Sequence, residues 1–239
     1  MKYLSWEKIR NVKDLSSHIG CSEEDLAQLS DPRVKRYNYR EMRIPKKGVR
    51  KSDPYRVVYE VINPILKLIQ KNLSTELCHL ANFENYVQGF VLKRSIVSNA
   101  RLHLGKRFLM KADIHHFFES ISTKQVKDAF LSVGANESIS ELLAEICTHK
   151  DCLPQGASSS PVLANLVCKE LDKCLEALSK EYESTYSRYA DDITISGNGE
   201  IPPYNKVQDI LLKSGFRLRD DRLQFQKWRK AICHRVDGI

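Results

Sequence analysis

The sequence contains no C-x-x-C pair and no hydrophobic run long enough to cross a membrane. Its seven cysteines are scattered and odd in number, which argues against a zinc site or a disulfide framework and favours reduced, buried thiols. The first residues, MKYLSWEKIRNVKD, lack the apolar core of a signal peptide, and no segment approaches the ~20 apolar residues of a membrane span. We therefore expect a cytoplasmic protein without a membrane partner.

Internal repeats, low-complexity segments and Gly/Ser linkers are also lacking, so we expect one continuous folding unit. The 239 residues, 42% of them hydrophobic, suffice for one large globular domain or a domain with an attached lobe. Lys and Arg outnumber Asp and Glu by 38 to 30, which gives a formal net charge of +8 and a pI near 9.1. This excess fits a polyanionic partner such as nucleic acid, and it fits a merely soluble basic protein equally well.

Hydrophobic spacing predicts an alternation of strands and capped helices. Residues 37–44 and 55–61 are rich in aromatic and branched side chains and flank a basic connection, which predicts a hairpin with a positively charged tip. A helix is expected over residues 64–80. Further helices are expected after three serine caps, at Ser122 with Gln125, at Ser138 with Glu141, and at Ser160 followed by Pro161.

The helix that begins near Ser160 carries a wide apolar stripe as far as Leu178 and must lie on a partner. The natural partner is a sheet built from the segments RFLMKADI, STYSRYA and ITISG. Strands separated by helices, with a hairpin at an acidic pair, predict an α+β layer and not a doubly wound sheet.

Three aspartates stand at the ends of these expected strands. Asp191 and Asp192 lie between TYSRYA and ITISG, and Asp113 ends FLMKAD. Aspartate also favours turns, so the pair alone is equally compatible with a structural turn. If a sheet brings all three together, they repel one another unless a divalent cation neutralises them. Mg²⁺ prefers such oxygen ligands, and two ions about 4 Å apart promote in-line phosphoryl transfer.

Several motifs resemble those of reverse transcriptases, in the same order along the chain. YADD, residues 189–192, resembles their catalytic hairpin, and ADIHHFF resembles the strand-end motif that supplies their other metal-binding aspartate. LPQGASSSPVLANL is similar to the nucleotide-site loop and following helix of the bacterial enzymes. SNARLHLG has the N-A-x-x-H spacing of the retron branch. Together the motifs span roughly residues 37 to 225.

The resemblance implies the fingers–palm architecture of right-hand polymerases, an α+β fold with an antiparallel palm sheet that carries the YADD hairpin. The expected domains are an N-terminal helical region, fingers with an interleaved segment, and a palm, at residues 1–36, 37–105 with 120–152, and 106–239. The family's helical thumb is expected to be absent from this chain.

The same resemblance implies the roles of the acidic residues. Asp113, Asp191 and Asp192 are expected to be catalytic and to hold two Mg²⁺ ions, for which Mn²⁺ is a possible substitute. The backbone carbonyl of Ile114 is expected as an additional ligand. Arg222 stands where the family usually presents a lysine; it is expected to stabilise the leaving group by charge but hardly to donate a proton.

Residues expected to bind the incoming dNTP follow from the same motifs. Phe118 falls at the position of an aromatic steric gate against the ribose 2′-hydroxyl, although ordinary core packing is an alternative that we accept for Phe117. The remaining expected contacts are Gln155 and Gly156 in the nucleotide-site loop, and Arg56, Arg50 and Lys51 in the basic hairpin. A simple helix-entry turn is the alternative for the loop; it explains Gly156 but does not require Gln155.

Five residues are expected to contact nucleic acid, and four of them have an alternative role. Tyr189 resembles a residue near the primer end and is equally compatible with packing in the sheet. Asn99 and His103 belong to the N-A-x-x-H element, where a structural or an RNA-contacting role fits His103. Lys46 and Lys47 fit either template-backbone contact or a solvated loop.

For a retron enzyme the resemblance implies an RNA-directed DNA polymerase. Its template and primer platform would be a dedicated structured non-coding RNA, its substrates dNTPs, and its product a covalent RNA–DNA hybrid in anti-phage defence with an effector protein. The alternatives are an abortive-infection or CRISPR-linked defence reverse transcriptase and a catalytically weak RNA-binding scaffold. Three retained carboxylates argue against the scaffold, because a pure binder has no use for mutually repelling acids.

Overall fold

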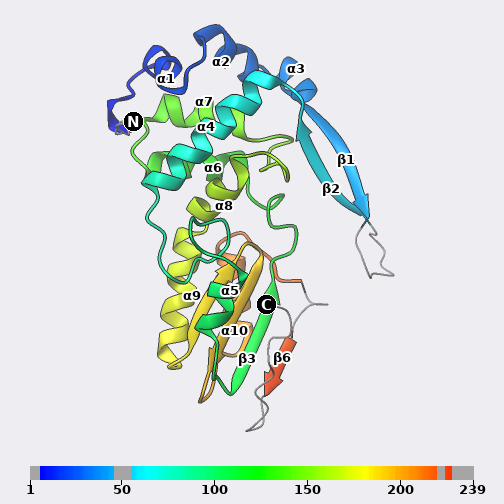
Figure 1. Ribbon diagram of the computed structural model, residues 1–239, viewed down its shortest axis with the longest axis vertical. Helices are drawn as coiled ribbons and strands as arrows, with labels where there is room; N and C mark the ends of the chain where they lie inside the picture. Colours follow the sequence, from blue (N-terminus) through cyan, green and yellow to red (C-terminus); the bar gives the residue numbers. More distant parts are fainter. Residues whose placement is uncertain (1–5, 46–54, 220–223, 228–239) are drawn as a thin grey trace. The chain divides into compact units, whose positions relative to one another are not determined.

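The computed structural model describes residues 6–45, 55–219 and 224–227 of the chain. The chain forms two compact units (Figure 1). The first comprises Met1–Asn82 with His116–Cys168, and the second comprises Phe83–His115 with Lys169–Ile239. Each unit is therefore assembled from two stretches that are separated in sequence.

The first unit is mainly helical, and α8 packs against α4 and α6, while α6 also packs against α7. Ser22 caps α2 together with Asp25. Ser122 caps α6 together with Gln125, as the sequence predicts. The elements are η1 (Trp6–Lys8), α1 (Val12–Ile19), α2 (Glu23–Ser30), α3 (Pro32–Lys35), η2 (Arg36–Asn38), β1 (Tyr39–Pro45), β2 (Tyr55–Val61), α4 (Pro64–Leu80), α6 (Thr123–Ser132), α7 (Glu137–Cys147) and α8 (Ser160–Val167).

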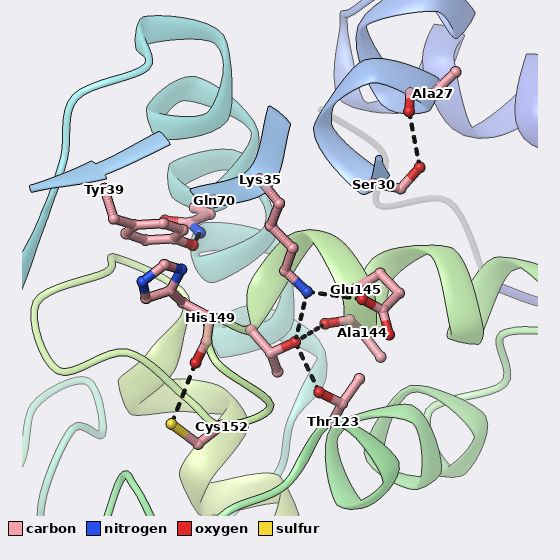
Figure 2. A network of polar contacts seen from close by, with 11 residues as sticks. Ala27, Ser30, Lys35, Tyr39, Gln70, Thr123, Ala144, Glu145, His149 and Cys152 are labelled. Atoms are coloured by element: carbon pink, nitrogen blue, oxygen red, sulfur yellow. Dashed lines mark hydrogen bonds and ion pairs between the residues drawn. The ribbon is translucent and has the colours of Figure 1, made fainter. Parts of the chain in front are cut away.

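The predicted hairpin is confirmed, since β1 and β2 pair antiparallel from Tyr39 opposite Val61 to Pro45 opposite Tyr55. Its base is anchored by polar and aromatic contacts (Figure 2). The Gln70 amide donates to the Tyr39 hydroxyl at 2.9 Å, and the Tyr39 ring lies 4.5 Å from that of His149. Nearby, the Lys35 ammonium donates to Glu145 at 2.7 Å. The base of the hairpin is thus attached to α4 and α7, while most of β1 is exposed.

Two of the expected helix starts are wrong. Asn136, and not Ser138, caps α7, because the Asn136 side chain accepts from the Ile139 N–H at 3.0 Å. The cap position before α8 is Ser159, which makes no side-chain cap bond, while the Ser160 hydroxyl donates to the Pro154 carbonyl at 2.8 Å.

The long helix expected from Ser160 to Leu178 is also wrong, because it breaks at Cys168. The buried, apolar α8 belongs to the first unit, and the amphipathic α9 (Lys169–Glu181) belongs to the second. The apolar spacing continues across the break, so periodicity alone does not reveal it.

Over its described residues, the second unit consists of a four-stranded antiparallel sheet and three helices. The strand order is β4-β5-β3-β6 (Figure 1), and the hairpin predicted at the acidic pair is confirmed as β4–β5. The elements are α5 (Ile96–Leu102), β3 (Phe108–Asp113), α9, β4 (Thr185–Tyr189), β5 (Asp192–Gly197), α10 (Tyr204–Lys213) and β6 (Gln224–Lys227).

Alternating residues of β4 bind helices on opposite faces of this sheet. Arg188 binds Asp172 of α9, whereas the Ser187 hydroxyl donates to Asn99 of α5 at 2.7 Å. Because successive side chains of a strand point to opposite faces, α5 and α9 cover different faces. The buried Met110, Ile193 and Ile195 share a face with Arg188 by register and form the core beneath α9.

No helix within the described ranges combines the length and the apolar character that a membrane crossing requires.

Candidate active site

The strand register places the three aspartates at one end of the sheet. Asp113, the last residue of β3, is directly opposite Asp192, the first residue of β5. Directly opposite residues of an antiparallel pair share a face and have Cβ atoms about 5 Å apart. The carboxylates of Asp113 and Asp192 therefore leave the sheet on the same side, which is the side of α5.

Asp191 lies in the turn that joins β4 to β5. Its backbone carbonyl accepts from the Ile114 N–H at 2.9 Å, so the turn is bonded to the residue that follows Asp113. Ala190, the other turn residue, has a φ of 57°, a region that residues other than glycine rarely adopt. Asp113 is buried, Asp191 is half-buried and Asp192 is exposed, so the site opens to solvent at the turn.

Arg219 lies beside Asp113 and forms an ion pair with it. The backbone N–H of Arg219 donates to the backbone carbonyl of Asp113 at 2.8 Å, and the side-chain Nε of Arg219 lies 3.3 Å from Asp113 Oδ1. A carboxylate that is only 3% exposed needs such a partner, because burying a charge without compensation is costly.

The donor chemistry at this sheet end fits a hard divalent cation. Carboxylates and the backbone carbonyl of Ile114 are oxygen ligands of the kind that Mg²⁺ prefers. Over residues 6–45, 55–219 and 224–227, no group of three or more His, Cys, Asp and Glu side chains is already gathered as a metal site. The backbone register thus brings the three residues together, while the carboxylates themselves are not clustered around one point.

His103 and Asn99 attach α5 to the same face of the sheet. One ring nitrogen of His103 lies 2.7 Å from the Ser187 hydroxyl, and the other lies 2.7 Å from the Ser196 hydroxyl. Burial, together with the nearby Lys106 and Lys111, lowers the pKa of the His103 imidazole from 6.5 to about 4. These contacts favour the structural alternative for His103 over direct contact with RNA.

The depressed pKa of His103 predicts that acidification weakens the fold. The unfolded chain takes up this proton near pH 6.5 and the folded chain only near pH 4, so the contribution is complete above pH 6.5 and is lost as the pH falls toward 4. Between these values we expect a loss of at most about 3 kcal/mol in the free energy of unfolding. Denaturant titrations of the wild type and of His103→Gln measure the difference; equal pH slopes would contradict the assignment.

In the first unit, the predicted nucleotide-site loop is bonded to β2. The Gln155 carbonyl accepts from the Tyr59 N–H at 2.7 Å. Gly156 has a φ of 117°, and a Cβ there would lie 2.7 Å from the Tyr59 carbonyl oxygen. Glycine is therefore required both by the backbone conformation and by the close approach. Arg56, on the same strand, is exposed.

The two neighbouring phenylalanines differ in burial. Phe117 is 4% exposed, in agreement with core packing, whereas Phe118 is half-buried, and their ring centroids are 5.3 Å apart. Tyr189, in the second unit, is half-buried opposite Asp192 on the carboxylate face. The predicted site residues Lys46, Lys47, Arg50, Lys51 and Arg222 lie outside the described residues.

Four residues around the aspartates were not singled out from the sequence: Gly89, Asp172, Arg188 and Arg219. For Asp172 and Arg188, the available signal was a charged residue at a position that the apolar spacing assigns to the core. Asp172 interrupts the apolar stripe of α9 three residues before Leu175, and Arg188 lies two residues after the buried Tyr186. A buried charge of each sign implies a pair, but the sequence does not say that these two meet.

Residues 44–232 match the family model described as "Reverse transcriptase (RNA-dependent DNA polymerase)". The chain is 34% identical over 211 residues to "Retron Ec86 reverse transcriptase" of Escherichia coli, which covers 88% of this chain and 64% of that protein. It is 31% identical over 207 residues to "Retron Mx162 reverse transcriptase" of Myxococcus xanthus, covering 74% and 42%. The chain thus spans less than two thirds of the length of these curated relatives.

Among solved structures, the chain is similar to a telomerase from Candida albicans. The TM-score is 0.54 and the identity 13%, over 79% of this chain and 42% of that one. At this identity the likeness concerns the fold alone, and it agrees with the α+β fingers–palm architecture expected from the motifs.

Proposed function

Because the chain belongs to the reverse transcriptase (RNA-dependent DNA polymerase) family, we propose that it extends a primer with deoxynucleotides by copying RNA. The observation that supports this best is the register of β3 against β5, which sets Asp113 opposite Asp192 next to the turn that holds Asp191. The reaction joins the primer 3′-hydroxyl to the α-phosphorus of a dNTP and releases pyrophosphate.

The three aspartates are the proposed ligands of two divalent cations, with the carbonyl of Ile114 as a further oxygen donor. Mg²⁺ is the proposed ion and Mn²⁺ a substitute; when bound, such ions lower the barrier to attack by the hydroxyl and neutralise the charge of the leaving group. The protein's own contribution is to hold the carboxylates at fixed positions, with Arg219 ion-paired to Asp113.

Nucleotide contacts are proposed for residues that lie mostly in the first unit. Phe118 is the proposed steric gate, and Gln155 and Gly156 form the proposed nucleotide loop, which is bonded to β2. Arg56, with Arg50 and Lys51, is proposed to bind the triphosphate. For Arg222, the proposal is stabilisation of the leaving group without proton donation.

The finer proposal is a retron-type enzyme in the cytoplasm. Its template would be a structured non-coding RNA and its product an RNA–DNA hybrid, formed in anti-phage defence together with an effector protein. Tyr189, Lys46 and Lys47 are the proposed contacts to nucleic acid. The names of the similar retron enzymes and the net charge of +8 support this proposal.

Primer extension tests the proposal directly. The chain is incubated with a heteropolymeric RNA template, an annealed primer, dNTPs and Mg²⁺, and the products are sequenced. We expect template-dependent DNA that disappears on chelation of the metal. Binding of RNA without any incorporation would favour the scaffold, and incorporation without regard to the template would favour an untemplated defence polymerase.

The Phe118→Ala variant is expected to accept ribonucleotides more readily. Removing the ring removes the proposed clash with the 2′-hydroxyl, so the preference for dNTP over rNTP in kcat/KM should fall by about tenfold or more. The matched control is Phe108→Ala, which removes a half-buried ring from the first residue of β3, at the end of that strand away from Asp113. Unchanged selectivity in Phe118→Ala would exclude Phe118 as the gate.

A further inference from the structure

A buried pair of charges lies beneath the turn that carries Asp191. Arg188 is 0% exposed and Asp172 is 1% exposed. The guanidinium binds the carboxylate with two donors, Nε to Oδ1 and Nη2 to Oδ2, each at 2.7 Å. Tyr186 adds its hydroxyl to Asp172 Oδ1 at 2.7 Å. The pair therefore holds the arginine side chain of β4 in one orientation relative to α9.

The third guanidinium nitrogen connects this pair to the turn. Arg188 Nη1 donates to the carbonyl of Ala190 at 3.1 Å. Ala190 is the residue with a φ of 57°, immediately before Asp191. A non-glycine residue persists in this region only where its surroundings hold it there. The bond from Arg188 is one such restraint, and it is applied to the peptide that joins Ala190 to Asp191.

The strand itself has other attachments and does not depend on this side chain. The backbone N–H of Arg188 donates to the Tyr86 carbonyl at 2.8 Å, and the backbone carbonyl of Arg188 accepts from the backbone N–H of Gln88 at 2.8 Å. Both bonds join main-chain atoms and do not involve the Arg188 side chain. What the side chain adds is its link from Asp172 to the carbonyl of Ala190.

Stability alone is a weak explanation for such a pair. Apolar residues of similar volume often replace a buried ion pair without loss of stability, because the desolvation of both charges offsets their attraction. A buried ion pair is better explained where it fixes the position of neighbouring groups. The turn of Ala190 and Asp191 is a place where such a fixed position would matter.

We propose that Arg188, held by Asp172, is a positioning residue that fixes the Ala190 carbonyl and thereby the placement of Asp191 and Asp192. Through these carboxylates it sets the affinity of the site for a divalent cation. The inference rests on the proposed function insofar as the aspartates are taken to bind that cation.

The decisive variant replaces the buried polar group by apolar residues, with Asp172→Leu, Arg188→Met and Tyr186→Phe combined. If the pair serves only stability, this variant folds and binds Mn²⁺ as the wild type does. If Arg188 positions the turn, the variant folds but binds Mn²⁺ about tenfold to a hundredfold more weakly, because loss of a partner that orients metal ligands typically weakens metal binding by that factor.

Two single variants keep the test valid should the combined variant fail to fold. Arg188→Lys keeps the charge but has one side-chain nitrogen in place of the three that bind Asp172 and Ala190. We therefore expect it to bind Mn²⁺ more weakly. In primer extension, a higher Mg²⁺ concentration should partly restore its activity. Tyr186→Phe is the matched control. It removes the hydrogen bond to Asp172 Oδ1 but keeps Arg188 and its bond to the carbonyl of Ala190, so Mn²⁺ affinity should stay unchanged.

Mn²⁺ binding is measured by electron paramagnetic resonance of the free ion, and folding by circular dichroism melting. Wild-type Mn²⁺ affinity in Arg188→Lys or in the folded apolar variant would overturn the inference. The measurement needs no polymerase activity, so it is distinct from the test of the proposed function. A wild type that binds Mn²⁺ but incorporates no dNTP would contradict the proposed function alone.

Discussion

The Asp113→Asn variant is expected to lower the rate of deoxynucleotide incorporation by about a thousandfold or more, which corresponds to about 4 kcal/mol at the transition state. The substitution keeps the size of the side chain and its place opposite Asp192, but it removes one of the three charges that are proposed to hold the cations. Single-turnover primer extension at saturating dNTP measures the effect.

The matched control for this prediction is Asp209→Asn, which neutralises an exposed aspartate on α10 of the same unit. Both variants change the net charge equally, so a general weakening of nucleic-acid binding would affect them alike. Circular dichroism melting checks that Asp113→Asn still folds. A folded Asp113→Asn with a rate within threefold of wild type would show that this carboxylate is not part of the reaction centre.

The Gly89→Ala variant is expected to displace the turn that joins β4 to β5 and carries Asp191. A Cβ at position 89 would lie 2.4 Å from the nitrogen of Ala190 and 3.0 Å from the carbonyl carbon of Tyr189. Both are backbone atoms, so relief of the clash requires β4 or the loop before α5 to move. We expect a loss of about 1 to 3 kcal/mol in the free energy of unfolding. The incorporation rate should fall about a hundredfold, because the displaced peptide leads directly to Asp191.

Gly199→Ala is the control for this substitution. It makes the same chemical change in the same unit, but a Cβ at position 199 meets no atom within 4 Å. Urea titration and primer extension on both variants distinguish a local clash from a general effect of losing glycine. Wild-type rates in Gly89→Ala would mean that the loop yields without moving the turn.

Local patterns predicted much of this fold. The β1–β2 hairpin, the β4–β5 hairpin and the cap at Ser122 follow from alternation, turn residues and capping boxes, all of which act over a few neighbouring residues. The aspartates were likewise recognisable because they stand at strand ends. Their roles in catalysis remain a prediction.

Long-range packing decided what the sequence did not reveal. The break at Cys168 depends on α8 being buried in one unit and α9 in another, and the apolar spacing is the same on both sides. Asn136 and not Ser138 occupies the N-cap of α7, although both residue types are good caps. The pairing of Asp172 with Arg188 depends on how α9 lies against the sheet, which periodicity does not specify.

The sheet register also has a consequence for protein synthesis. Among the described residues, β3 pairs with β5 and β6, and both follow it in the chain. Asp192 comes 79 residues after Asp113 (192 − 113), which takes roughly 4 to 16 s at ribosomal rates. During that interval β3 has emerged with both of its edges unpaired, a state in which strands associate with other chains. Slower accumulation of nascent chains, as at reduced temperature, should therefore favour recovery of folded protein.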